Sequence, residues 1–479
     1  MPITATETTA GHGIIEGAGI TIQDPRTGDV LWTVPQAGPD AVFDAVNVAR
    51  RAAPGWAATA PAERGAALRT AARALDAAAR QLAGLNASET GRPEDEALAG
   101  IGAAVSTLEQ YAELGPVHRG HSLRGGRFAS DYTVAEPRGV AVLLTPWNDP
   151  VAVACGLIGA ALVTGNAVIH KPSERCPRLG EALGEVLAPA FPAGVFLTIS
   201  GGADVGAALS QAEVDVVAHV GSSAAGSRIA RAAVGTGAHV LRENGGNDPL
   251  LVDRDVDPVW AAEQAAIGAF SNSGQICTSV ERVYVHKDIA HDFCRALEAE
   301  AALRNGSGSV APLVDVRMRD AVHGHVTAAL GQGARAVEGG SLPDGPGSFY
   351  PATVLLDCTE GMQVMTEETF GPVAPVQVVD TFDDGLRLAC SGRYGLAATV
   401  LSSNIAHIQQ AVAALPVGTV KVNAVFGGAP GGAAQPRGES GAGFGYGPEL
   451  LDEFTQVKVV HIAAPPPAAG TSADGQDRP

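Results

Sequence analysis

Between Gly139 and Val220 the chain alternates short apolar runs with longer, Ala-rich segments. The apolar runs cover residues 139–145, 167–170, 194–199 and 214–220, and segments of helical length lie near 150–163, 179–187 and 205–209. Strands of a parallel sheet are buried on both faces, so they read as continuous apolar runs joined by helices. The alternation predicts a doubly wound α/β fold, in which ligands bind beyond the ends of the strands.

One part of this region, Val151 to Ile169, contains no charged residue. A run of about 20 apolar residues can cross a bilayer. This run, however, is rich in alanine, has few large apolar side chains and is interrupted by Gly165-Asn166. A buried helix, a turn and a short buried strand explain it better, so we expect no membrane span.

The composition limits the possible partners. The chain has 479 residues, enough for two or three packed units rather than one core. Hydrophobic residues make up 46% and charged residues 17%, which is typical of a globular protein. The formal net charge is −19 and no basic cluster occurs. Nucleic acid and an anionic membrane surface are therefore not expected as partners.

The cysteines are scattered, without a Cys-x-x-Cys pair or a metal-like histidine spacing. This pattern predicts a reduced, cytoplasmic setting and no metal site. The first residues, Met1 to Thr8, lack a positive region followed by an apolar core, so we expect no secretion signal. The cysteines are Cys155, Cys176, Cys277, Cys294, Cys358 and Cys390.

Cys277 lies between a Ser-Asn-Ser-Gly turn at 271–274 and a β-branched run at 283–285. A nucleophilic thiol needs an exposed position held by the backbone, and a turn leading into a packed element provides one. Taken alone, a free cysteine is more simply a buried structural residue. Two companions favour catalysis: Glu243 in a Gly-rich turn, and Asn148 after an apolar strand. Thiol, carboxylate and amide are the three parts of a covalent thioester mechanism.

Six short motifs occur along the chain in a characteristic order, and with them the chain resembles the aldehyde dehydrogenase superfamily. The similarity continues outside the motifs, from about Asp24 to about Lys458. One motif alone would be a weak signal, whereas six in the family's order are a strong one. They are Pro-Trp-Asn-x-Pro at 146–150, Lys-Pro-Ser-Glu at 171–174, Gly-Ser-x-x-x-Gly at 221–226, Glu-x-Gly-Gly at 243–246, Gly-Gln-x-Cys at 274–277 and Glu-Glu-x-Phe-Gly-Pro-Val at 367–373.

The resemblance implies an α/β, aldehyde dehydrogenase-like fold with a Rossmann-type cofactor domain, an α/β catalytic domain and a small β oligomerisation arm. We assign residues 1–113 and 139–246 to the NAD-binding domain, 247–445 to the catalytic domain, and 114–138 with 446–463 to the arm. Arms of this kind usually bury against another copy, so a homodimer or homotetramer is implied. Residues 464–479 are low in complexity and are expected to form a disordered tail.

The family's reaction, NAD-dependent oxidation of an aldehyde substrate to a carboxylic acid, implies a role for each of three residues. The Cys277 thiolate would add to the aldehyde carbon, and loss of hydride to the nicotinamide would leave a thioester. Asn148 would stabilise the alkoxide through its side-chain amide, together with the backbone N–H of Cys277. Glu243 would be the general base for the water that hydrolyses the thioester.

The resemblance also implies a cofactor site. Lys171 and Glu174 would reach the adenosine ribose, and the carboxylate would favour NAD over NADP by repelling a 2′-phosphate, although NADP stays possible. The helix start at Gly221-Ser222 suits a pyrophosphate. Glu368 and Phe370 would position the nicotinamide ribose and ring. The full cofactor-binding set is Trp147, Lys171, Ser173, Glu174, Gly221, Ser222, Glu368 and Phe370.

Three positions depart from the family pattern. Asn247 stands where lysine is common. Asp149 replaces an aromatic residue that by resemblance lines the aldehyde tunnel; it could select a polar or cationic substrate, but Asp149-Pro150 also reads as a helix cap followed by proline at the first helical position. Arg437 stands where phenylalanine is common, and it could pair with a substrate carboxylate or lie on the surface.

Other functions are weighed against this one. A CoA-acylating relative would pass the acyl group to a thiol, and Glu243 argues against it. A catalytically inactive, binding-only member would not need Cys277, Asn148 and Glu243 together. A cysteine hydrolase finds no support, because no histidine stands in a recognisable base motif.

Outside the motifs we make a few local predictions. Helices are expected to begin at Pro39 and near Thr59, where threonine can cap, and the second is expected to continue to Gly91. No regular element is expected over 303–309, and the Gly-rich segment 427–447 reads as a long loop. The chain is expected to be loose over roughly its first 20 residues.

Overall fold

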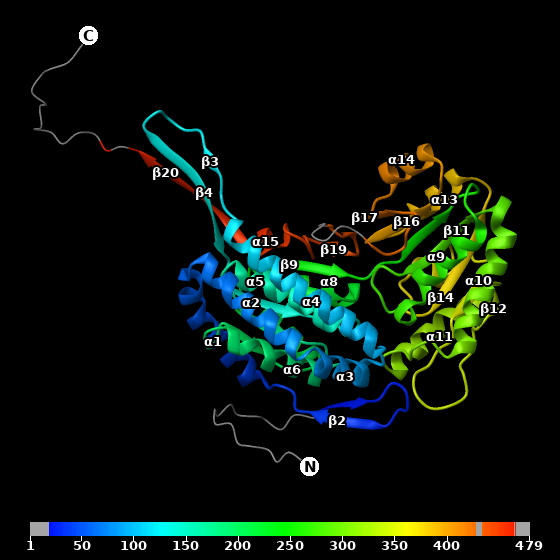
Figure 1. Cartoon of the computed structure of the whole chain (residues 1–479), viewed down its shortest axis with the longest axis horizontal. Coiled ribbons are helices and arrows are strands. Elements are labelled where there is room, and N and C mark those ends of the chain that lie inside the picture. Colours follow the sequence, from blue (N-terminus) through cyan, green and yellow to red (C-terminus); the bar gives the residue numbers. More distant parts are fainter. Residues whose placement is uncertain (1–18, 428–433, 464, 466–479) are drawn as a thin grey trace, which may run out of the picture.

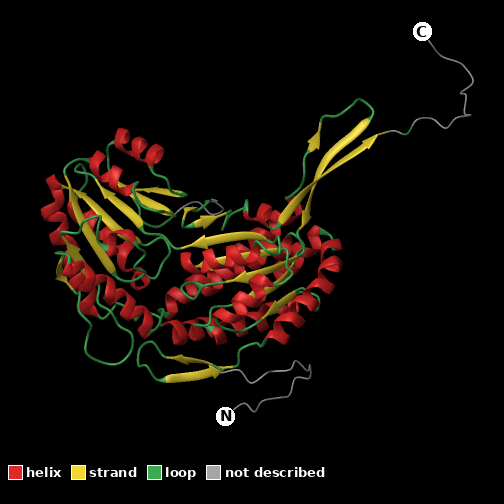
Figure 2. Cartoon of the chain, turned by 180° about the vertical axis from the view of Figure 1, so that it is seen from behind, coloured by secondary structure: helices red, strands yellow, loops and turns green. Residues whose placement is uncertain are grey.

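The computed structural model describes residues 19–427, 434–463 and 465. They form two lobes, each built on a mostly parallel sheet with helices on both faces, and a thin β arm that projects from one lobe (Figures 1 and 2). A hairpin of β1 (Ile20–Gln23) and β2 (Val30–Val34) lies at the opposite side from the arm. Both chain ends that we expected to be loose fall almost entirely outside the described residues.

The first sheet is built from β5 (Val140–Leu144), β6 (Ala167–Lys171), β7 (Phe196–Thr198), β8 (Val216–Gly221), β9 (His239–Asn244) and β19 (Gly441–Ala442). Its order is β19-β9-β8-β5-β6-β7, and all pairs are parallel except β19 with β9. The chain builds from β5 to one side and then returns to the other side with β8 and β9. The order reverses between β5 and β8, and open α/β sheets bind ligands at such a switch point.

Helices bury both faces of this sheet. On one face α2 (Pro61–Ala77), α4 (Glu94–Leu114), α5 (Pro150–Val163) and α6 (Pro177–Leu187) share a large apolar core with Leu143 and Val168. On the other face α1 (Pro39–Ala58) and α7 (Ala203–Gln211) close a smaller core with Val142 and Ile169. Every residue of β5 and β6 is buried, including His170 and Lys171 at the end of β6. The remaining elements of this lobe are α3 (Ala79–Thr90), α8 (Ser223–Ala233), η1 (Gly115–Val117) and η2 (Ala188–Ala190).

The second sheet has the order β12-β13-β14-β11-β10-β16-β17, with every pair parallel except β12 and β13. Its strands are β10 (Asp248–Val252), β11 (Val280–His286), β12 (Arg335–Glu338), β13 (Thr353–Leu356), β14 (Val373–Val379), β16 (Ala397–Leu401) and β17 (Thr419–Val422). One face packs on α9 (Pro258–Phe270) and α10 (Lys287–Ser307), and the other on α11 (Val316–Gly331), α13 (Phe382–Ala389) and α14 (Ile405–Ala414). Shorter elements are η3 (Ser271–Gly274), α12 (Gln363–Thr366), β15 (Tyr394–Gly395) and β18 (Arg437–Gly438), whereas α15 (Leu450–Glu453) packs on the core of the first lobe.

The arm is a three-stranded sheet of β3 (Ser122–Leu123), β4 (Ala129–Pro137) and β20 (Thr455–Ala463), in the order β20-β4-β3 (Figure 1). β4 and β20 pair antiparallel along their whole lengths, from Pro137 opposite Thr455 to Ala129 opposite Ala463. β20 is an edge strand on which Val457 and Val459 are 71% and 67% exposed. The arm therefore presents an unpaired strand edge that is partly apolar.

Several local predictions were wrong. The helix expected from Thr59 to Gly91 is two helices, because Ala78 (φ −93°, ψ 1°) leaves the helical region between α2 and α3. Thr59 does not cap α2; it ends α1, and its hydroxyl donates to the carbonyl of Gly55. The segment 303–307 belongs to α10, which the buried Ala301 anchors and Gly308 ends at φ 67°. The expected loop over 427–447 contains β18 and β19, with 428–433 outside the described residues.

The charge-free segment that raised the question of a membrane span folds as α5, a turn and β6, inside the first lobe. Among the described helices, none combines the length and the apolar character that a bilayer crossing requires.

A buried arginine joins the start of the first lobe to its core. Arg64 of α2 donates to the carbonyls of Val163, Ala57 and Thr59 at 2.8, 3.2 and 2.5 Å, and burial lowers the pKa of its guanidinium. Arg64→Leu leaves these carbonyls without a donor, and we expect it to lower the free energy of unfolding by about 2–4 kcal/mol. Urea denaturation followed by circular dichroism measures the change.

The matched control is Arg69→Leu on the same helix, where Arg69 forms an exposed ion pair with Glu113 at 3.2 Å. Such pairs contribute about 0–1 kcal/mol, so this variant should unfold nearly as the wild type does. Equal losses in the two variants would contradict the structural role of Arg64.

Candidate active site

The predicted motifs of the first lobe meet at one edge of its sheet, because parallel strands end at the same edge. Trp147 and Asn148 follow β5, Lys171 ends β6, Gly221 ends β8, and Glu243 lies one residue before the end of β9. The switch point between β5 and β8 therefore lies in the middle of these side chains.

The turn that leads to Cys277 has a strained backbone. Asn272 and Ser273 adopt left-handed conformations with φ of 46° and 54°, which is unfavourable for residues other than glycine. Gln275 holds the turn: its amide group donates to the carbonyl of Asn272 at 3.0 Å and its side-chain oxygen accepts from the N–H of Val314 at 2.9 Å. The thiol thus stands on a backbone that is fixed from two sides.

Asn148 reaches this turn from the other lobe. Its Nδ2 donates to the carbonyl oxygen of Gln275 at 3.1 Å, two residues before Cys277 in the chain. The backbone carbonyl of Asn148 in turn accepts from Arg92 Nη1 at 3.1 Å. The residues predicted as nucleophile and oxyanion donor are therefore brought together, although 129 positions separate them (277 − 148).

Glu243 lies half-buried in β9 and packs closely on Gly445, where a Cβ atom would overlap its carboxyl group. Burial raises the pKa of Glu243 to about 7. A carboxyl group that titrates near neutrality can both take up and release a proton under ordinary conditions. Its carboxyl group is also among the charges that act on the Cys277 thiol.

Glu368 shares this space. Its carboxyl group lies against Gly245, where a Cβ atom would overlap it. Burial, followed by the carboxyl groups of Glu281 and Asp248, raises the pKa of Glu368 well above its usual range. Glycine is therefore required at position 245, because the carboxyl group of Glu368 packs directly against its backbone.

Phe370 and Trp147 form the aromatic part of the site, with ring centroids 5.6 Å apart in an edge-to-face arrangement. Phe370 has φ 52°, and the Glu281 carboxylate holds this backbone by accepting from the N–H groups of Thr369 and Phe370 at 2.9 and 2.7 Å. The guanidinium of Arg175 stacks on Trp147 at 5.2 Å. Two predicted cofactor-binding residues from different lobes thus lie together.

The Cys277 thiol lies in a strongly acidic environment. Burial, followed by the carboxyl groups of Glu243, Asp248 and Glu368, raises the pKa of this thiol to about 12, and Lys421 acts in the opposite direction. Only the thiolate is an effective nucleophile. The charges around Cys277 therefore decide how reactive it is.

The predicted ribose-binding residues follow β6. Lys171 Nζ lies 3.8 Å from Glu174 Oε2 and donates to the carbonyl of Pro172 at 2.9 Å. Ser173 is buried, and its hydroxyl accepts from the N–H of Arg175 at 3.2 Å, which shapes the loop. The side chain of Glu174 is 43% exposed, so its carboxylate is available to accept from a sugar hydroxyl.

The predicted pyrophosphate site is the N-terminus of α8. Ser222 caps this helix, because its hydroxyl accepts from the N–H of Ala225 at 3.3 Å. The next hydroxyl, of Ser223, is buried and has no hydrogen-bond partner within the described ranges. Free N–H groups at a helix start and an unpartnered hydroxyl fit an anionic group, so the residues present fit a dinucleotide.

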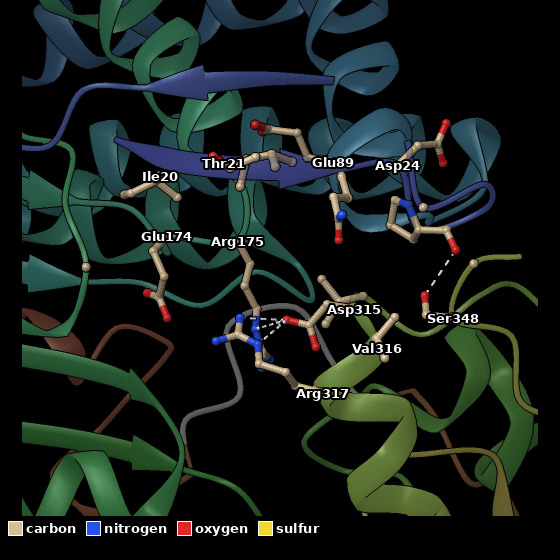
Figure 3. A pocket seen from close by; sticks show the side chains of 17 residues that line it. Ile20, Thr21, Asp24, Glu89, Glu174, Arg175, Asp315, Val316, Arg317 and Ser348 are labelled. Atoms are coloured by element: carbon tan, nitrogen blue, oxygen red, sulfur yellow. Dashed lines mark hydrogen bonds and ion pairs between the residues drawn. The ribbon is translucent and has the colours of Figure 1, made fainter. Parts of the chain in front are cut away.

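Glu174 and Arg175 line a cavity of about 420 Å³ between the lobes (Figure 3). The hairpin strand β1 and the start of α11 form its other walls. Arg175 Nε lies 3.1 Å from a carboxylate oxygen of Asp315, which also pairs with Arg317 at 2.8 Å. Asp315 of the second lobe therefore lies between two guanidinium groups and partly offsets the charge of the cation beside Glu174.

Asp149 occupies the N-cap position of α5, with Pro150 at the first helical position, as the sequence predicts. Its side chain nevertheless makes no capping hydrogen bond. The carboxylate instead lies 2.9 Å from Arg92 Nη1, because a charge-assisted pair is stronger than a bond to a neutral N–H. The prediction of a side-chain cap was wrong.

The other two departures from the family pattern differ in position. Arg437 is exposed on β18, which pairs with β15. Asn247 is buried, and its Nδ2 donates to Glu281 Oε2 at 3.3 Å and to the carbonyl of Glu367 at 3.1 Å. Asn247 therefore supports the carboxylate that holds the Phe370 backbone.

Sequence reasoning missed three charged residues near the thiol: Asp248, Glu281 and Lys421. Each is a charge inside or at the start of an apolar strand. Asp248 and Glu281 are each 4% exposed. Because charged side chains are almost never buried without a partner, such interruptions of a strand pattern could have indicated a site.

Cys277 of the second lobe thus lies beside the amide of Asn148 and the carboxyl group of Glu243, at the switch point of the first sheet, where open α/β sheets bind ligands. Comparison with known proteins gives the family. The model of the aldehyde dehydrogenase family matches residues 15–460. A betaine aldehyde dehydrogenase of Cereibacter sphaeroides (strain KD131 / KCTC 12085) is 34% identical over 467 residues, covering 94% of this chain and 95% of that protein. The chain belongs to the aldehyde dehydrogenase family.

Solved structures agree. An NADP-dependent enzyme of Escherichia coli has a TM-score of 0.89 at 30% identity, covering 93% of this chain and 95% of that one. Betaine aldehyde dehydrogenase of Staphylococcus aureus in complex with NAD+ has a TM-score of 0.90 at 27% identity, covering 95% and 93%. The predicted fold and reaction class are confirmed. The chain is an oxidoreductase that oxidises an aldehyde to a carboxylic acid with a nicotinamide cofactor, NAD or NADP.

The raised pKa of Glu243 has a consequence for stability. A carboxyl group whose pKa is about 7 in the folded chain and about 4.3 when unfolded lowers stability as pH rises between those values. Glu243→Gln stays neutral, so we expect it to be more stable than the wild type at pH 8 and nearly equal to it at pH 4.5. Thermal unfolding at the two pH values measures the difference.

Glu298→Gln serves as the control, because Glu298 is exposed on α10. Its effect on the unfolding temperature should be small and the same at both pH values. A Glu243→Gln variant without any pH-dependent gain would show that the carboxyl group is better solvated than the structure indicates.

Proposed function

We propose that Cys277 is the nucleophile of this oxidation, Asn148 the oxyanion donor and Glu243 the base for the hydrolytic water. The observation that carries the proposal is the 3.1 Å hydrogen bond from Asn148 Nδ2 to the carbonyl of Gln275. It holds a side-chain amide from one lobe beside the turn that carries the thiol in the other. Glu243, like Asn148, lies at the edge of the first sheet that is formed by the C-terminal ends of its strands.

The thiolate of Cys277 adds to the aldehyde carbon, and the carbonyl oxygen becomes an alkoxide. The amide hydrogens of Asn148 stabilise that oxygen, and removing a donor of this kind typically lowers the rate by about 10²–10³. When bound, the nicotinamide supplies the hydride acceptor that makes the thiohemiacetal a thioester.

Glu243 acts in the second half of the reaction. Its carboxylate takes a proton from water as the water oxygen attacks the thioester carbon, the carbon–sulfur bond breaks, and the acid leaves with the thiolate restored. A pKa of about 7 suits a group that must accept this proton and release it again. A CoA-acylating enzyme has no need of this base, which is why we favour hydrolysis.

We further propose that the cofactor lies along the C-terminal ends of the strands of the first sheet. We also propose that NAD is preferred to NADP. Glu174 would repel a 2′-phosphate, and the adjacent cation, Arg175, is already paired with Asp315. Lys171 and Ser173 would complete the ribose end. The pyrophosphate would lie at Gly221 and Ser222, and the nicotinamide half at Trp147, Glu368 and Phe370.

The two-lobed arrangement supports the proposed division into an NAD-binding domain (1–113 and 139–246), a catalytic domain (247–445) and an arm (114–138 and 446–463). Within the catalytic range, β19 crosses to pair with the first sheet. The exposed edge of β20 supports assembly into a homodimer or homotetramer through the arm. Free cysteines, without a disulfide among the described residues, support a reducing, cytoplasmic setting.

For the substrate we propose a small aldehyde. Betaine aldehyde is the first candidate, because a relative that is 34% identical to this chain is a betaine aldehyde dehydrogenase. Asp149 would not select the cationic group. Its carboxylate already pairs with Arg92 at 2.9 Å, and Glu96 lies 3.8 Å from the same guanidinium, so Asp149 is part of an ion-pair network and is not a free carboxylate. Arg437, exposed on β18, likewise stays a surface arginine in this proposal.

Glu243→Gln tests the order of events. We expect one rapid burst of NADH about equal to the enzyme concentration, followed by a steady rate lowered by about 10²–10⁴, because acylation is intact while hydrolysis lacks its base. Rapid-mixing absorbance of NADH and mass spectrometry of the acyl-enzyme measure both phases.

Cys277→Ser is the companion variant: it should show no burst while binding NAD as the wild type does. Cys294→Ser, a half-buried cysteine on α10, is the matched control and should keep full activity. Turnover in the Cys277 variant would refute the nucleophile, and an unchanged steady rate in Glu243→Gln would remove that residue from the mechanism.

Asp149→Asn tests the substrate proposal. We compare kcat/KM for betaine aldehyde with that for its uncharged carbon isostere, tert-butylacetaldehyde. The ratio should change less than about 3-fold, because Glu96, 3.8 Å from Arg92, still pairs with this guanidinium when Asp149 loses its charge. A fall of about tenfold or more in the ratio, equal to about 1.4 kcal/mol, would show that Asp149 selects cations after all.

A further inference from the structure

A lysine interrupts an apolar strand beside the site. Lys421 belongs to the edge strand β17, where it lies opposite Thr399 of β16, which in turn lies opposite Leu250 of β10. Because side chains alternate along strands, Lys421 shares a sheet face with Thr399, Leu250 and, two residues before Leu250, Asp248. Lys421 Nζ lies over the Phe426 ring at 5.3 Å.

Asp248 connects this face to the thiol. Its Oδ1 accepts from the N–H of Ala397 at 3.1 Å, whereas its Oδ2 is buried and has no hydrogen-bond partner in the described part of the chain. A Cβ atom at Gly246 would contact both Asp248 Oδ1 and, at 3.0 Å, the backbone oxygen of Cys277. An incompletely partnered carboxyl group thus lies beside the backbone of the nucleophile.

Several carboxyl groups form a cluster beside the thiol. Glu243 from β9, Asp248 from β10 and Glu368 from the loop after α12 act on the thiol, and Glu281 of β11 acts on Asp248 and Glu368. Burial raises the pKa of Asp248 to about 8 and that of Glu281 to about 7, so this cluster keeps protons that exposed carboxyl groups would lose.

Only two cations face this cluster among the described residues whose charges act on it, Arg282 and Lys421. Arg282 is held by neutral acceptors, the carbonyls of Asn247 and Ala389 at 2.8 and 3.4 Å and the hydroxyl of Tyr284 at 3.3 Å. Asn247 also contacts Glu281, but as an amide it adds no positive charge to the cluster. Lys421 has no hydrogen bond or ion pair to the described residues and is the cation that acts on the thiol.

We propose that Lys421 is a positioning residue for the nucleophile: its ammonium group balances the carboxyl cluster and stabilises the Cys277 thiolate. The proposal rests on the proposed role of Cys277. Burial lowers the pKa of Lys421, while Asp248 and Cys277 raise it, as expected for groups that stabilise one another's charged forms. Burial and the carboxyl groups of Glu243, Asp248 and Glu368 disfavour the thiolate form of Cys277. Lys421 favours it.

The test is the pH dependence of Cys277 alkylation by iodoacetamide in the full-length protein without aldehyde. Mass spectrometry of the labelled peptide separates Cys277 from the other cysteines. Lys421→Met removes the charge at similar length, and we expect the alkylation rate at each pH between about 7 and 9 to fall about tenfold, because the thiolate fraction falls. Lys421→Arg should restore most of the wild-type profile. Lys287→Met, which removes an exposed lysine paired with Asp380 at 2.9 Å, is the control and should leave the profile unchanged.

NAD affinity verifies that each variant is folded, and Lys421→Gln replaces the methionine variant if that one does not bind NAD. An unchanged alkylation rate between about pH 7 and 9 in a charge-removing variant with normal NAD affinity would overturn the proposal. Because alkylation requires no turnover, this failure is distinct from a failure of the proposed function, which would appear as activity retained in Cys277→Ser.

Discussion

The desolvation of several carboxyl groups around one thiol is the constraint on which the rest of the site depends. An ionised carboxylate out of water costs several kcal/mol unless it is partnered, so these groups either bind protons or need donors. Glu281 obtains donors from backbone N–H groups, and Glu243 titrates near pH 7. The glycines at 245 and 445 allow the carboxyl groups of Glu368 and Glu243 to lie directly against the backbone. Gly245 and Gly445 therefore provide the space that these two carboxyl groups occupy.

The two lobes contribute different kinds of group. In the first sheet the loops that follow the parallel strands all lie at the C-terminal ends of the strands, next to the switch point between β5 and β8. The second sheet presents the starts of β10 and β11, with the strained turn before Cys277. Contacts between the lobes include the polar pairs Asn148 with Gln275 and Arg175 with Asp315, and the aromatic pair Trp147 with Phe370. The chemistry consequently depends on how the lobes are held together, and not on either lobe alone.

Much of this could be predicted. The strand–helix alternation gave the doubly wound sheet, and the six motifs gave the family. The errors arose where tertiary packing overrode local pattern. One apolar-periodic stretch became two helices at Ala78, and an Ala-rich segment continued α10 past 303. At Asp149 the local rule identified the right position but the wrong partner, because Arg92 comes from a distant loop.

By itself the sequence determined which chemical groups this chain carries, since the motifs place a thiol, an amide and a carboxyl group in local turns with particular residue types at particular spacings. Only the tertiary structure decided the electrostatics of that chemistry. Asp248, Glu281 and Lys421 come from strands that are far apart in sequence, and they become neighbours only when the sheet pairs β10 with β11 and β16 with β17. The physical reason is that a pKa depends on burial and on charges close in space, and neither quantity is written in the local sequence.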